Sequence, residues 1–197
     1  MARLTRQEVI IMMQKGDDLD FSNDDLRDMD MHKLNLRGAN FTNADLGYAD
    51  LTEADLTDAV FVNANLSHTN LRGANLRRTT FEKANLWSTN LSSCRLKYAR
   101  FLNANMSGAN LHLADCRETN FKGANLTLAN MVRANLRDAD LSETNLTSAI
   151  LAGADLSDAN LHEADMRTTL LKKHDDQGGV IEACLEGTIM PDGSVHE

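Results

Sequence analysis

A series of basic residues is the strongest candidate for chemistry in this chain. Four of them recur at intervals of twenty residues, and three more lie close by in the sequence. The series is Arg77, Lys97, Arg117 and Arg137, with Arg78, Arg95 and Arg100 nearby. Cationic side chains repeated at a fixed interval could bind an acidic partner surface or an anion. The series is therefore the candidate binding face.

The charges of the chain are segregated along the sequence. The formal net charge is −9. Counting Lys and Arg against Asp and Glu gives 3 against 12 for residues 17–65, 11 against 3 for residues 66–137, and 1 against 7 for residues 138–171. The chain is thus acidic, then basic, then acidic, and the basic series lies in the middle segment.

A second interpretation of the basic series needs no partner. The same stretch carries Asp115, Glu118, Asp138 and Asp158. These carboxylates could pair with the cations in a solvated lattice of surface ion pairs, each contributing roughly 0–1 kcal/mol. The sequence alone leaves both interpretations open.

Other kinds of chemistry find little support in the sequence. Cys94 and Cys116 fall at apolar positions of the pattern described below, so we expect buried side chains rather than ligands or nucleophiles. The six His residues occupy unrelated positions, and neither a phosphate-binding loop nor a nucleophile with a spaced His and acid is found. We expect no catalytic site, no metal and no cofactor, and therefore not an enzyme.

Every fifth residue from Phe21 to Leu171 is large and apolar, without an insertion or deletion. At most of these positions a small residue, usually Ala and sometimes Thr, lies two residues earlier, and Asn or Asp usually lies between the two. A period of five matches neither the 3.6 residues of a helical turn nor the two of a strand. The pattern predicts a repeat architecture.

The phenylalanines reveal a longer period. They recur every twenty residues, and Leu141 and Leu161 continue the series. The six positions are Phe21, Phe41, Phe61, Phe81, Phe101 and Phe121. Because twenty residues are four units of five, we expect a four-sided all-β solenoid of about eight coils with the rings stacked in its core. At about 4.8 Å per coil the rod would be roughly 37 Å long.

Units such as Ala39-Asn40-Phe41 and Ala44-Asp45-Leu46 resemble the pentapeptide repeat family, including its cyanobacterial members. The resemblance implies a right-handed quadrilateral β-helix. It also implies an alternative function, because gyrase-protecting members present an acidic rod to a topoisomerase as a mimic of DNA. The basic middle segment and the uninterrupted register speak against mimicry here, so a noncatalytic rod for macromolecular binding or scaffolding is the first expectation.

The two ends depart from the repeat. Thr5-Arg6-Gln7-Glu8 has the form of a capping box and Gly16 is placed to end a helix, so we expect a capping helix within residues 1–16. The repeat would occupy residues 17–171. Residues 172–197 should leave it and form a second cap, with a loop at 174–179, a short helix or strand at 180–185 and a turn at 191–193.

The composition favours a cytoplasmic protein, and its patterned charge favours a protein partner. The longest apolar run, residues 9–13, is too short to span a membrane, and three Cys residues without metal-type spacing fit a reducing compartment. Nucleic acid is a less favoured partner, because the acidic ends would repel phosphates and only Tyr48, Trp87 and Tyr98 are expected as exposed rings. A monomer, an end-to-end dimer and a purely structural or envelope-associated element all stay open.

Overall fold

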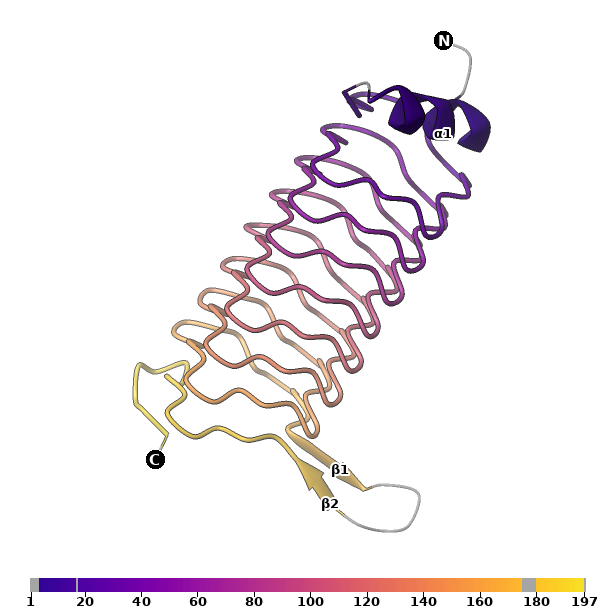
Figure 1. The fold of residues 1–197 in the computed structure, drawn as a ribbon. Helices are drawn as coiled ribbons and strands as arrows, with labels where there is room; N and C mark the ends of the chain where they lie inside the picture. Colours follow the sequence, from indigo (N-terminus) through magenta and orange to yellow (C-terminus); the bar gives the residue numbers. More distant parts are fainter. Residues whose placement is uncertain (1–3, 17, 175–179, 197) are drawn as a thin grey trace.

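A long solenoid runs between a helix at one end and a small hairpin at the other (Figure 1). The computed structural model describes residues 4–16, 18–174 and 180–196. The helix α1 spans Arg6–Lys15, and the strands β1 (Lys172–His174) and β2 (Val180–Glu182) form the antiparallel hairpin. The expected right-handed quadrilateral β-helix with an N-terminal helix is confirmed.

Each coil contains twenty residues. Parallel bridges join residues twenty apart throughout the rod, from the pair Asp20 and Asn40 to the pair Ile150 and Leu170. A coil has four faces: in the second coil the first face is residues 39–43, the second 44–48, the third 49–53 and the fourth 54–58, and later coils repeat them every twenty residues. The apolar residue at the middle of each face points into the core.

Backbone hydrogen bonds between coils explain the five-residue unit. The N–H of Phe41 donates to the carbonyl of Val60 at 2.7 Å, and the N–H of Asn43 donates to the carbonyl of Val62 at 2.9 Å. Asn43 has φ 59°, and the last residue of nearly every unit is likewise left-handed. Such a backbone favours Asn, Asp and Gly, which are common at this position. The unit is therefore a short bridge followed by a tight turn.

The core is filled as the sequence predicts. The six Phe rings stack along the first face, with centroids 4.6–5.1 Å apart, and all six are fully buried. Cys94 and Cys116 are also buried, and burial raises the pKa of the Cys94 thiol to about 12. That thiol donates to the Leu71 carbonyl, as threonine hydroxyls do at equivalent positions. Both cysteines are thus structural.

Asparagine side chains link the coils on the outside of the rod. The Asn85 amide donates to Asn65 Oδ1 at 3.0 Å, and the Asn105 amide donates to Asn85 Oδ1 at 3.1 Å. A second ladder includes the pair Asn90 and Asn70. Because each amide both donates and accepts, stacked asparagines satisfy one another from coil to coil.

The N-terminal helix covers the first coil as expected. Both hydrogen bonds of the capping box between Thr5 and Glu8 are present, and Gly16 ends α1 with φ 72°. Val9 is fully buried, and Met12 and Met13 pack against the core. The helix thereby shields apolar surface that an open solenoid end would expose.

The C-terminal segment corrects one prediction. Residues 183–190 do not leave the repeat, because Asp155 pairs with Cys184 and Asn160 with Ile189 in parallel bridges. These partners are 29 residues apart instead of twenty, so the β1–β2 excursion is an insertion after which the coil resumes. Val180–Glu182 is a strand and residues 191–192 form a turn, whereas residues 175–179 of the expected loop lie outside the described residues.

Candidate binding face

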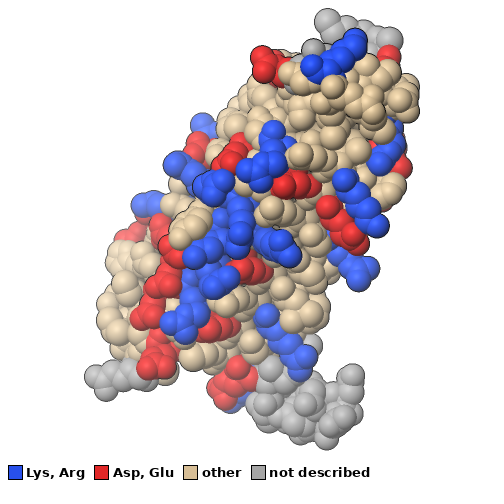
Figure 2. Space-filling model, viewed as in Figure 1, with Lys and Arg blue, Asp and Glu red and all other residues tan. Residues whose placement is uncertain are grey.

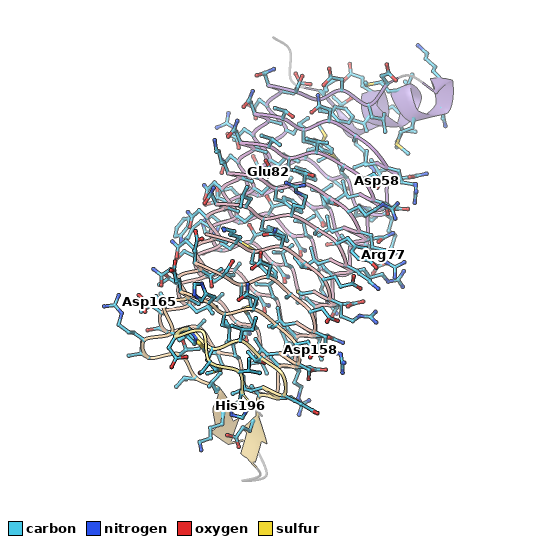
Figure 3. All side chains as sticks on the ribbon, turned by 90° about the vertical axis from the view of Figure 1, so that its left-hand side faces the viewer. Asp58, Arg77, Glu82, Asp158, Asp165 and His196 are labelled. Atoms are coloured by element: carbon cyan, nitrogen blue, oxygen red, sulfur yellow. The ribbon has the colours of Figure 1, made fainter. Side chains whose placement is uncertain are left out.

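The basic series lies on the fourth face, as its spacing predicts. In each coil three residues of this face point outward. In two adjacent coils in the middle of the rod they are residues 75, 77 and 78, and residues 95, 97 and 98. Lys and Arg side chains gather over the middle of the rod, with Asp and Glu toward its C-terminal end (Figure 2). Asp58, Arg77 and Asp158 lie along one edge, and Asp165 lies on the opposite edge (Figure 3). The segregation of charge along the sequence is therefore preserved in space.

Three of the four cations that recur at intervals of twenty residues are neutralised by carboxylates. Lys97 Nζ lies 3.0 Å from Glu118, and Arg117 Nε lies 2.7 Å from Asp115. Arg137 approaches Asp155 and Asp158 at 3.9 and 3.7 Å. Of the carboxylates that the ion-pair interpretation named, Asp115, Glu118 and Asp158 pair in this way, whereas Asp138 has no ion pair in the described part of the chain.

The pKa values of the paired groups shift accordingly. The hydrogen bond from Arg117 lowers the pKa of Asp115, and Arg77 adds a smaller Coulombic contribution. The hydrogen bond to Glu118 raises the pKa of Lys97, whose ammonium also lies 4.7 Å above the ring of Tyr98. Because Asp115 is hydrogen-bonded to Arg117, Arg77 forms no ion pair with a carboxylate within the described residues.

Two further cations of the series are also paired. Arg78 Nε lies 2.6 Å from Asp58, in the preceding coil, and this hydrogen bond raises the pKa of Arg78. Arg100 lies on the first face rather than the fourth, and pairs there with Glu82 at 2.7 Å. The structure therefore separates Arg100 from the rest of the candidate face.

Arg77 and Arg95 remain without an ion pair among residues 4–16, 18–174 and 180–196, and both are exposed. They occupy adjacent coils of one face, with Arg78 and Lys97 beside them. We call these four residues the basic cluster. With Arg117, the region holds five cations against three carboxylates, Asp58, Asp115 and Glu118, so two positive charges are not neutralised.

Sequence reasoning missed two carboxylates that pair with cations of the basic series. Asp58 and Glu82 pair with cations in an adjacent coil, at separations of twenty and eighteen residues. The twenty-residue period would have placed Asp58 next to Arg78, at the same position of the preceding coil. The described part of the chain contains no group of three His, Cys, Asp or Glu side chains that could hold a metal, and no helix there is long and apolar enough to cross a membrane.

Two family models match the repeat. One, described as pentapeptide repeats (8 copies), matches residues 20–58 and 129–167, and the other, described as pentapeptide repeat region, matches residues 54–130. The chain belongs to the pentapeptide repeat family. The two models together span this pentapeptide rod from its first bridge to the unit that contains Asp165. A comparison with curated proteins gives no match.

Solved structures of other pentapeptide repeat proteins are similar to the rod. HetL, involved in heterocyst differentiation regulation in the cyanobacterium Nostoc sp. strain PCC 7120, is 26% identical over 98% of this chain and 100% of its own, with TM-score 0.40. QnrB1, a plasmid-mediated fluoroquinolone resistance protein, is 17% identical over 87% and 89%, with TM-score 0.38. An Arabidopsis thaliana thylakoid lumen protein is 26% identical over 57% and 72%, with TM-score 0.30.

Proposed function

We propose that the protein is a noncatalytic rod that binds a partner protein through the basic cluster. The observation that carries this proposal is the absence of an ion pair for Arg77 and Arg95 in the described part of the chain. An acidic surface would complete the pairing that the rod itself leaves incomplete. Electrostatic complementarity of this kind gives specificity and a fast association rate.

The rod supports such binding because its faces are rigid. Every coil is hydrogen-bonded to the next, and the guanidinium groups are anchored to backbone that is fixed by those bonds. Little backbone entropy would be lost when a partner docks. The proposed action is therefore scaffolding: the rod holds charges at fixed spacing for another macromolecule, in the cytoplasm and without a cofactor.

The partner is proposed to be a protein rather than nucleic acid. The basic middle segment, residues 66–137, is flanked along the rod by segments with 12 and 7 carboxylates, which would repel a phosphate backbone that extended beyond it. The basic cluster also weighs against mimicry of DNA toward a topoisomerase such as gyrase. A mimic needs continuous negative charge, and the fourth face interrupts it.

Charge reversal at the unpaired arginines tests the proposal. We expect wild type to bind a fluorescein-labelled oligoglutamate peptide in fluorescence anisotropy titrations at physiological salt. The Arg77→Glu/Arg95→Glu variant should bind at least roughly tenfold more weakly, because like charges replace the two attractive ones. Far-UV circular dichroism confirms that each protein is folded.

The matched control is Lys83→Glu/Arg133→Glu. These two residues are also exposed, lack an ion pair in the described structure and change the net charge by the same amount, but they lie outside the fourth face. The control should retain most of the affinity of wild type. Equal weakening of both variants would show that only net charge matters and would refute the proposed site.

A further inference from the structure

A column of three rings, two of them exposed, lies at the corner between the second and third faces, away from the basic cluster. The rings of Tyr48 and His68 stack with centroids 4.7 Å apart and planes inclined by 15°. Trp87 follows in the next coil, 4.6 Å from His68 and inclined by 72°. Tyr48 and Trp87 are 64% and 48% exposed. We call Tyr48, His68 and Trp87 the aromatic ridge.

The fold does not require these rings. Tyr48 and His68 have φ of 61° and 58°, a left-handed conformation that bulky residues disfavour. Stacking between coils offsets part of this cost, but it does not explain why so much ring surface faces solvent. The adjoining positions hold small residues: Gly47, Ser67, Ser88, Ser107 and Gly108. The ridge therefore stands above its surroundings.

Carboxylates gather at the Tyr48 end of the ridge. The Asp45 carboxylate adjoins the turn that carries Tyr48, because a Cβ at Gly47 would lie 3.3 Å from Asp45 Oδ1. Its Oδ2 already lies 3.7 Å from Arg27 Nε in the preceding coil. Asp50 accepts hydrogen bonds from the N–H and hydroxyl of Thr52 and has no ion pair within the described ranges. Neutral asparagine ladders flank the rest of the ridge.

We propose that the aromatic ridge, with Asp50, is a docking site for arginine side chains on an extended basic segment of a partner protein. A guanidinium is planar and weakly hydrated, so it can stack on an aromatic ring while it donates hydrogen bonds to a carboxylate. The inclined ring of Trp87 is not covered face to face by His68, and Tyr48 carries no second ring on its other side in the described structure. Both rings can receive a cation.

This site is independent of the proposed function of the basic cluster, because it lies on different faces and selects the opposite charge. A rod with an acidic aromatic site and a basic site can hold two partners of unlike charge. Tyr and Trp set among Ser, Gly and Asn is also the composition of protein-binding surfaces that rely on rigid aromatic anchors. The carboxylates exclude a phosphate-bearing partner from the same surface.

The single tryptophan makes the proposal directly measurable. Trp87 is the only Trp in the chain, so its fluorescence reports on the ridge alone. We expect octa-arginine peptide to change Trp87 emission saturably. Octa-lysine should bind roughly tenfold more weakly, because an ammonium group is more strongly hydrated and lacks the planar face with which a guanidinium stacks on a ring. Tyr48→Ser should weaken octa-arginine binding by roughly tenfold, and Asp50→Asn should weaken it as well.

Tyr98→Ser is the matched control, because Tyr98 is a half-exposed tyrosine with φ 66° on the basic fourth face. It should bind octa-arginine as wild type does. Three results would each overturn the proposal: equal weakening by Tyr48→Ser and Tyr98→Ser, equal affinity for octa-arginine and octa-lysine, or no saturable change in emission. Circular dichroism and the thermal midpoint of each variant exclude loss of folding as the cause.

Discussion

Replacement of Phe81 by alanine is expected to lower the free energy of unfolding by roughly 3–5 kcal/mol. The ring of Phe81 lies between those of Phe61 and Phe101, at centroid distances of 4.9 and 4.7 Å, and is fully buried. Its neighbours are fixed by hydrogen bonds between coils, so they cannot move in to fill the space. The lost contacts and the remaining cavity both destabilise the rod. Urea denaturation monitored by circular dichroism measures the change.

Phe81→Leu is the control for this prediction. Leu141 and Leu161 already occupy the same column and are fully buried, so the core accepts leucine there. The leucine variant should lose clearly less stability than the alanine variant. If Phe81→Ala changed the free energy of unfolding by less than about 1 kcal/mol, the neighbouring coils would have to collapse freely, contrary to a rigid stacked core.

Deletion of residues 101–120 is expected to leave a folded, shorter rod. The deletion removes one complete coil and joins Arg100 to Phe121, so every later residue keeps its face and Phe121 stacks on Phe81. Because each coil contacts only its neighbours, the cost should be close to one coil and its interface. The far-UV spectrum should keep its shape, and unfolding in urea should stay cooperative.

Deletion of one more residue, 100–120, should behave differently. It joins Ala99 to Phe121 and leaves one face with four residues instead of five. Four residues are too few to form the bridges to both neighbouring coils and also the turn that ends the face. We expect a large loss of stability or failure to fold. Equal stability of the two deletions would contradict a strict twenty-residue coil.

Most of the rod could be predicted from the sequence because its period determines which residues face inward. Every Phe of the column, the asparagine ladders and the capping box of α1 follow from spacing and residue type. The resumed coil at the C-terminal end was missed because the insertion breaks the register. A local signal was present: Leu185 and Met190 are five residues apart, and Ala183 and Thr188 each lie two residues earlier.

The candidate face was only partly predictable. Spacing correctly placed Arg77, Lys97, Arg117 and Arg137 in one column, but it could not tell which of them pair. Pairing depends on side-chain direction, as in the hydrogen bond from Arg117 to Asp115, two residues away in the same coil. The aromatic ridge was not predicted, because Trp87 is nineteen residues from His68 and so does not occupy the same position of the twenty-residue coil.

The measurement that tests the account most directly is affinity capture from the source cell's lysate with three proteins: wild type, Arg77→Glu/Arg95→Glu and Lys83→Glu/Arg133→Glu. Bound proteins are identified and quantified by mass spectrometry. We expect a protein with an acidic surface to be retained by wild type and by the Lys83→Glu/Arg133→Glu control, and lost from the Arg77→Glu/Arg95→Glu variant. The same set of proteins on all three would contradict a binding role for the basic cluster.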